Sequence, residues 1–205
     1  MSAAARENLF GLVLAGGRST RLGQDKVELP VAGQTLLART ASLAARFCSR
    51  VVVSGRNPAQ LGLELDWLPD DAPGLGPLGG ILTGLIHLGG PLLVLACDLP
   101  LLDEATVARL VEHRGRRPAG AVITTFLQSA TGFIEPLVAV YEDAARDHLA
   151  AARDAGVCKL ARALPEAGRH LIPYGPESAH VFFNVNYPAD LAVLERLHQQ
   201  AGSGL

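Results

Sequence analysis

The sequence is poor in cysteine, with only three residues of this type and no Cys-x-x-Cys pair. Cys48, Cys97 and Cys158 therefore predict neither a disulfide framework nor a zinc site, and they suit a reducing compartment. The first ten residues include Arg6 and Glu7 but no sustained apolar run, unlike a secretory signal peptide. We expect a cytoplasmic location.

Long apolar runs and large basic clusters are also lacking. No uninterrupted apolar stretch reaches the length of about 18 residues at which a membrane helix is expected. The formal net charge is −2, and Arg114, Arg116 and Arg117 form only one short basic patch. Sequence-independent binding to nucleic acid needs more cationic surface than this. We therefore expect no membrane and no nucleic-acid partner, whereas a small anionic ligand is compatible with the charge.

Strand-like and helix-like segments alternate along the 205 residues, with glycine and proline between them. Apolar or β-branched runs predict strands, and apolar residues at helical spacing predict helices. The expected strands cover 9–14, 51–53, 63–68, 91–96, 120–126 and 133–141, and the expected helices cover 35–47, 79–88, 104–113 (capped by Asp103), 142–155 and 187–199. This alternation predicts an α/β fold with three layers, in which helices cover both faces of a mostly parallel central sheet.

No break in composition divides the chain, so we expect a single domain over residues 1–205 with an ordered core over about 9–200. In such sheets ligands bind at the carboxyl ends of the strands, and polar residues there are the candidates for a site. The histidines, by contrast, share no catalytic spacing and are interpreted as structural.

A glycine-rich loop with three cations follows the first expected strand. It reads Leu14-Ala15-Gly16-Gly17-Arg18-Ser19-Thr20-Arg21-Leu22-Gly23-Gln24-Asp25-Lys26. Its glycines let backbone N–H groups approach a phosphate closely, and Arg21 and Lys26 add the positive charge that a triphosphate requires. The spacing matches neither the P-loop nor the dinucleotide-binding fingerprint. We predict a triphosphate-binding loop, against the alternative of a solvated surface loop.

Asp98 ends the wholly apolar run over residues 91–96. A residue at this position could be a helix cap or a turn former before Pro100. A carboxylate at the carboxyl edge of a central parallel strand is also well placed to hold Mg²⁺. The residues alone leave both interpretations open.

The segment Leu-Ala-Gly-Gly-x-Ser-x-Arg-x-Gly-x-Asp-Lys resembles the signature of the molybdenum cofactor guanylyltransferases. These enzymes belong to a larger group of Rossmann-like nucleotidyltransferases that includes sugar-phosphate and cytidylyl enzymes. The Ala-Gly-Gly start and Asp25-Lys26 are typical of the guanylyl branch, and cytidylyl relatives usually read Ala-Ala-Gly. The resemblance implies that Leu14, Ala15, Gly16, Gly17 and Lys26 bind the nucleotide. Cys97-Asp98-Leu99-Pro100 likewise resembles the family's metal-binding segment, which implies that Asp98 binds both Mg²⁺ and the nucleotide.

The positions that match the family's contacts to the nucleotide base depart from the family pattern. Ser54 stands where the pattern has a nucleotide-contacting asparagine, and Asn57 is an alternative contact from the following loop. Asp70 and Asp71 both lie where the family places an aspartate on the nucleotide, and the distance to Gly76 is one residue shorter than usual. We favour Asp70 because it follows the expected strand more closely.

Two further segments resemble parts of the family's pterin site. Gly76-Pro77-Leu78-Gly79-Gly80 is similar to Gly-Pro-Leu-Ala-Gly, which implies pterin contacts at Gly76 and Gly80. Asn184 and Asn186 match the asparagines of Phe-x-Asn-x-Asn-Thr-Pro, which implies that they face the pterin or the metal, although either could simply cap the last helix. Tyr187 replaces the threonine of that pattern. The segment 135–137 is either plain core or part of the floor of the active site.

The resemblance implies transfer of GMP from GTP to molybdopterin, with release of pyrophosphate. Arg21, Lys26 and Asp98 are the expected catalytic residues, and Mg²⁺ is the expected cofactor. An enzyme that makes this cofactor is expected to have cofactor-insertion proteins or molybdoenzymes as transient partners. The alternatives are a cytidylyl or sugar-phosphate transferase of the same fold, and a non-catalytic paralogue that binds GTP and the pterin.

Overall fold

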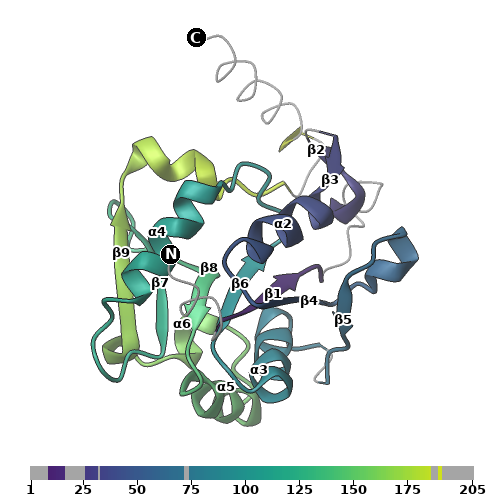
Figure 1. Ribbon diagram of the computed structural model, residues 1–205. Helices are drawn as coiled ribbons and strands as arrows, with labels where there is room; N and C mark the ends of the chain where they lie inside the picture. Colours follow the sequence, from purple (N-terminus) through teal and green to yellow (C-terminus); the bar gives the residue numbers. More distant parts are fainter. Residues whose placement is uncertain (1–8, 17–25, 32, 72–73, 186–188, 191–205) are drawn as a thin grey trace.

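A computed structural model of the chain describes residues 9–16, 26–31, 33–71, 74–185 and 189–190, with Lys26 and Pro30 described by their backbone alone. Its centre is a seven-stranded sheet with the strand order β5-β4-β1-β6-β8-β7-β9 (Figure 1). The strands are β1 (Phe10–Leu14), β4 (Arg50–Ser54), β5 (Asp66–Leu68), β6 (Leu92–Ala96), β7 (Ile123–Gln128), β8 (Ile134–Tyr141) and β9 (Arg169–Tyr174). A short antiparallel pair, β2 (Pro30–Val31) and β3 (Gln34–Thr35), stands apart from it.

Every strand of the large sheet except β8 runs in the same direction. Strands β4 and β6 both pair in parallel with β1, β5 pairs in parallel with β4, and β9 with β7. Strand β8 pairs antiparallel with both of its neighbours, β6 and β7. The predicted mostly parallel sheet is confirmed, and the carboxyl ends of all the parallel strands face one edge.

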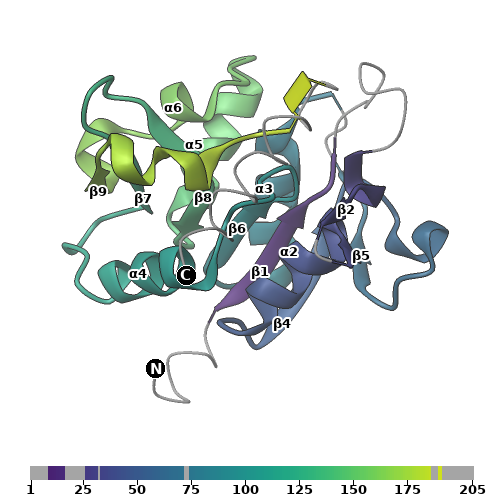
Figure 2. The ribbon, with the colours of Figure 1, turned by 90° about the horizontal axis from the view of Figure 1, so that it is seen from above.

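Helices cover both faces of the sheet, as predicted, and Figure 2 shows the two layers from above. Leu37 and Ala44 of α2 share one core cluster with Leu110 of α4, whereas Ile81 of α3 and Leu149 of α5 belong to a second cluster. The helices are α2 (Leu36–Ala45), α3 (Pro77–Leu88), α4 (Glu104–Arg114), α5 (Ala145–Asp154) and α6 (Leu160–Ala163), with short 3₁₀ turns η1 (Lys26–Glu28), η2 (Pro58–Leu61), η3 (Glu166–Gly168) and η4 (Pro176–Phe182).

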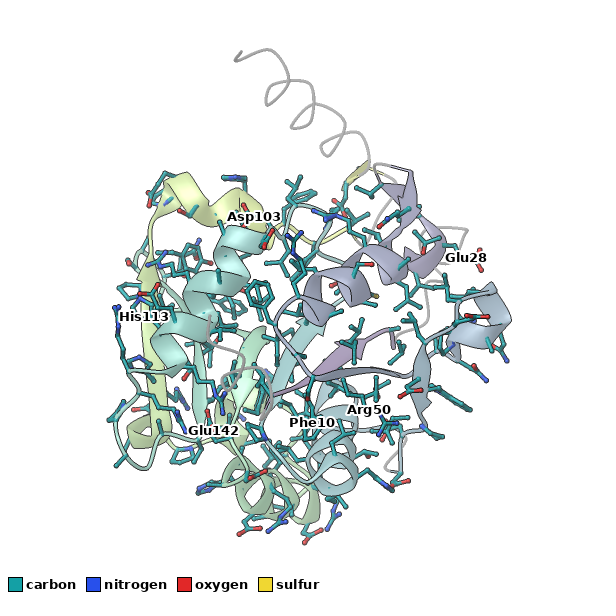
Figure 3. All side chains as sticks on the ribbon, in the orientation of Figure 1. Phe10, Glu28, Arg50, Asp103, His113 and Glu142 are labelled. Atoms are coloured by element: carbon teal, nitrogen blue, oxygen red, sulfur yellow. The ribbon has the colours of Figure 1, made fainter. Side chains whose placement is uncertain are left out.

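Local sequence explains where the helices around the site begin. Thr35 caps α2 by accepting a hydrogen bond from the Ala38 N–H at 3.2 Å, and Asp103 caps α4 through the Thr106 N–H at 2.8 Å. The predicted cap at Asp103 is confirmed, and Figure 3 labels this residue at the start of α4. Helix α3 begins at Pro77 because proline suits the first turn of a helix, where its missing N–H is not needed.

The structure differs from the sequence-based expectation at several elements, and the short elements β2, β3 and α6 are among those that were not predicted. Strand β9 was not predicted, because its sequence Arg-His-Leu-Ile-Pro-Tyr mixes polar residues with a proline, which edge strands tolerate. The helix expected from residue 142 begins only at Ala145, since the Glu142 N–H still donates to the Val122 carbonyl at 3.0 Å and extends the sheet pairing. The strand expected over 120–126 lies at Ile123–Gln128.

The helix expected over 187–199 lies outside the described residues except for 189 and 190. Among the helices that the structure describes, none is both long enough and apolar enough to cross a bilayer.

Candidate active site

A cavity of about 930 Å³ lies at the carboxyl ends of β5, β4, β1 and β6. This is the edge at which parallel sheets of this kind bind ligands. The cavity brings together eight of the residues predicted for the site, which are Leu14, Ala15, Gly16, Ser54, Asp70, Gly76, Gly80 and Asp98. Most of these residues lie at or just after the ends of β4, β1 and β6, which are side by side in Figure 1. Gly17, Arg21, Asn186 and the side chain of Lys26 lie outside the described residues.

The loops that follow β1 and β4 are held against each other beyond the strand ends. The Ala15 N–H donates to the Ser54 carbonyl at 2.9 Å, so this amide is engaged in the sheet and is not a donor to a phosphate. Gly55 has φ +98°, and a Cβ placed there would lie 2.7 Å from Gly16 Cα. Only glycine therefore permits this approach. The sequence pattern gave no sign of this role for Gly55, because the role follows from the contact with the loop after β1.

Asp98 enters the cavity from the end of β6, beside the loop that follows β1. The Cys97 N–H donates to the Leu14 carbonyl at 3.2 Å, which fixes the start of this turn. The carbonyl of Asp98 accepts a hydrogen bond from the Val185 N–H at 3.0 Å. The adjacent Asn184 is exposed and does not line the cavity, but this bond holds its segment next to Asp98.

A divalent cation fits Asp98 only together with a substrate. Among the residues that the structure describes, no group of three or more His, Cys, Asp or Glu side chains could hold a metal ion. Mg²⁺ is commonly bound by one or two carboxylates plus substrate phosphates and water, and it does not need a cage made of protein ligands. The single carboxylate of Asp98 in an open cavity has the chemistry of that kind of site.

The side chain of Asp70 faces the cavity, and that of Asp71 contacts helix α3 outside it. Asp70 lines the cavity, and its carboxylate accepts a hydrogen bond from the Thr83 hydroxyl at 3.4 Å. Asp71 instead forms an exposed hydrogen bond with His87 of α3, with 2.5 Å between Nε2 and Oδ2. The Asp71 N–H donates to the same Thr83 hydroxyl at 3.3 Å. Helix α3 thus holds both residues, and the one that faces the cavity is Asp70.

Gly80 has a packing role that does not depend on any ligand. A Cβ at this position would lie 2.7 Å from Ser54 Oγ and 3.2 Å from Leu14 Cδ2. The missing side chain lets the first turn of α3 press against the ends of β1 and β4. Asn57 also lines the cavity, but its side-chain oxygen accepts a hydrogen bond from the Ala59 N–H at 3.0 Å and caps η2.

The cavity wall also includes the long side chains of Arg56, Gln60 and Trp67, which were not predicted from the sequence. Arg56 comes two residues after the end of β4, and Gln60 belongs to η2. Both lie in segments with no periodicity, so only their position after a central strand could have indicated them. Arg56 adds a cation to a cavity that is predicted to hold a triphosphate.

The segment 135–137 contributes to both the cavity and the core. Leu137 lines the cavity, whereas the carboxylate of Glu135 accepts a hydrogen bond from the Tyr174 hydroxyl at 2.6 Å. Burial raises the pKa of Glu135 above its usual range, and the bond from Tyr174 opposes part of that shift. Burial, aided by the Glu135 partner, also raises the pKa of Tyr174.

The parallel sheet, the glycine loop after β1 and the carboxylate after β6 define a Rossmann-like nucleotide-binding protein. The family model of the MobA-like NTP transferase domain matches residues 11–169. A probable molybdenum cofactor guanylyltransferase of Chloroflexus aggregans is 32% identical over 199 residues, which cover 91% of this chain and 93% of that protein. The chain therefore belongs to the family of MobA-like NTP transferase domains and is a nucleotidyltransferase.

Two further proteins are similar over most of the chain. A molybdenum cofactor biosynthesis bifunctional protein of Synechocystis is 32% identical over 186 residues. The match covers 89% of this chain and 52% of that protein, so the chain spans about half of its length. The crystal structure of molybdopterin-guanine dinucleotide biosynthesis protein A from Archaeoglobus fulgidus has a TM-score of 0.74 and 25% identity, and it covers 93% of this chain and 99% of that one.

The position of Asp70 depends on the buried hydroxyl of Thr83. We expect Thr83→Val to raise the KM for the nucleoside triphosphate about fivefold, the equivalent of about 1 kcal/mol, because the hydrogen bonds to Asp70 and Asp71 are lost. Thr83→Ser should keep the wild-type KM. Thr40→Val is the matched control, since this buried hydroxyl donates to the Leu36 carbonyl within α2. Equal KM values for Thr83→Val and Thr40→Val in steady-state assays would contradict the assignment.

The raised pKa of Glu135 predicts a pH-dependent stability difference. The folded state binds this proton more tightly than the unfolded chain, so stability falls as pH rises from the ordinary value of about 4.3 through the folded pKa. Glu135→Gln cannot ionise and still accepts the Tyr174 hydrogen bond. Its free energy of unfolding relative to wild type should therefore increase between about pH 4 and about pH 7 in urea titrations. A difference that does not change with pH would disprove this prediction.

Proposed function

We propose that the protein transfers GMP from GTP to molybdopterin, which forms the molybdopterin guanine dinucleotide cofactor and releases pyrophosphate. The relatives named above as guanylyltransferase and as molybdopterin-guanine dinucleotide biosynthesis protein support these substrates. The observation that carries the proposal is the single cavity that gathers Gly16, Ser54, Asp70 and Asp98. In the reaction, a phosphate oxygen of molybdopterin attacks the α-phosphorus of GTP, and the bond between that phosphorus and the β-phosphate oxygen breaks.

The order of the strands supports one orientation of the nucleotide. The lining residues follow the sheet order, with Asp70 after β5, Ser54 at β4, Gly16 after β1 and Asp98 after β6. Neighbouring strands lie about 4.8 Å apart, so the ends of β4 and β6 are separated by about 10 Å. A nucleotide whose phosphates lie beside Asp98 therefore has its base near Ser54 and Asp70.

The acceptor then enters from the opposite flank, over β6 and β8. Leu137 lines that flank, and Asn184 lies beside it through the bond between Val185 and Asp98. We propose that Asn184 and Asn186 contact the pterin there. The family resemblance implied pterin contacts at Gly76 and Gly80. Because Gly80 lies against Ser54, we instead place Gly80, and Gly76 at the start of the same helix, on the nucleotide side of the cavity.

Positioning and charge account for the proposed chemistry. Gly17 and Arg21 of the loop after β1, together with Lys26, are proposed to bind the triphosphate and to neutralise its charge. Asp98 would hold Mg²⁺, which would supply further positive charge for the reaction. A phosphate nucleophile is already largely ionised at neutral pH because its second pKa is about 6, and no general base is needed. Among the described histidines, none lines the cavity.

The proposal is tested by incubating the protein with each nucleoside triphosphate, Mg²⁺ and molybdopterin. We expect the guanine dinucleotide and pyrophosphate from GTP, and much less product from ATP, CTP or UTP. A preference for CTP, or for a sugar phosphate as acceptor, would identify another nucleotidyltransferase of the same fold. Binding of GTP without release of pyrophosphate would instead identify a non-catalytic paralogue.

Two charges should be needed for turnover and not for folding. We expect Asp98→Ala and Lys26→Ala each to lower kcat at least about a hundredfold, because each removes charge that stabilises the reacting phosphates. Asp154→Ala is the control for Asp98→Ala, since Asp154 lies at the end of α5 in an exposed pair with Arg153. Thermal melts should give similar midpoints for all variants. Full activity of Asp98→Ala would exclude it as the metal ligand.

A further inference from the structure

Trp67 is the single tryptophan of the chain, and it lies on the wall of the cavity. It belongs to β5, the edge strand next to β4, and 43% of its surface is exposed. Large apolar side chains on the described surface are seldom this open, and the only others of this kind are Ile86 and Phe133. Neither of these lines the cavity. An open indole ring inside a cavity is a surface that a planar ligand can cover.

The register of β5 places the ring at the nucleotide end of the cavity. Trp67 pairs with Val53, one residue before Ser54, and Ser54 pairs with Leu68. Because side chains alternate along a strand, Trp67 lies on the α2 face of the sheet and Ser54 on the α3 face. Both line one cavity, which therefore reaches over the strand ends. Arg56 and Gln60, from the connection between β4 and β5, also line this cavity.

We infer that the indole ring of Trp67 stacks on the base of the bound nucleoside triphosphate. This inference rests on the proposed function, which puts the base at the ends of β4 and β5. Among the described residues that line the cavity, Trp67 is the one aromatic side chain. Every nucleobase has a π-face, so stacking contributes affinity without choosing the base. Ser54 and Asp70, which carry hydrogen-bonding groups, then determine selectivity.

The intrinsic fluorescence of the wild-type protein reports on this residue alone, because the chain has no other tryptophan. GTP and CTP should both quench the emission at concentrations that match their calorimetric dissociation constants. Inorganic triphosphate, which has no base, should bind the loop and leave the emission unchanged. Equal quenching by inorganic triphosphate and by GTP would overturn the inference.

Substitutions separate stacking from a merely structural role. Trp67→Leu should raise the KM for GTP about tenfold, because the stacking contact with the base is lost. It should leave kcat within about twofold, because this contact does not change during the chemical step. Trp67→Phe keeps an aromatic face and should restore most of the affinity. The preference for GTP over CTP should stay the same in both variants. Phe133→Leu is the control, since Phe133 is an exposed aromatic outside the cavity.

The outcomes distinguish this inference from the proposed function. If the wild type releases pyrophosphate from GTP and Trp67→Leu has an unchanged KM, stacking is wrong and the proposed function stands. If the wild type transfers no nucleotide to molybdopterin yet its emission is quenched by GTP and not by inorganic triphosphate, stacking stands and the proposed transfer is wrong. A decrease in kcat with unchanged KM in Trp67→Leu would also overturn stacking.

Discussion

The shared parallel register of β4, β1 and β6 is the constraint on which the site depends. Leu14 pairs with Ser54 on one side and with Ala96 on the other, so the three strands end at one level. Hydrogen bonds from Ala15 and Cys97 continue this alignment past the strand ends. Residues that are far apart in sequence, such as Ser54 and Asp98, therefore face one cavity. Glycine at positions 55 and 80 permits the close approach of the segments around them.

This arrangement explains how a nucleotidyltransferase can work although the described cavity wall has no histidine or cysteine. Its wall offers a carboxylate after β6, hydrogen-bonding groups after β4 and β5, and a cation at Arg56. These groups can orient a triphosphate and balance its charge, and orientation together with electrostatics carries phosphoryl-type transfers. Trp67 adds affinity for the base of the nucleotide, because its aromatic ring lines the cavity at β5, the strand most distant from Asp98 in the sheet order.

Much of the fold and part of the site could be predicted from the sequence. The runs that form β1 and β6 are apolar throughout because both faces of these strands are buried, and such runs are easy to recognise. Strand β9 was missed because an edge strand has no such pattern. The choice of Asp70 over Asp71 agrees with its place in the cavity, although the contact that separates them is the pairing of Asp71 with His87. Gly55 and Trp67 could not be identified, since their roles arise only when distant segments meet.

The central claim is that the nucleotide lies across the strand ends, with its phosphates at Asp98 and its base toward β5. The most direct test is a crystal structure of the protein with a non-hydrolysable GTP analogue and Mg²⁺. We expect density for the triphosphate beside Gly16 and Asp98, and for guanine between Asp70 and Trp67. A base that lies over β6 and β8, or a nucleotide bound outside this cavity, would contradict it.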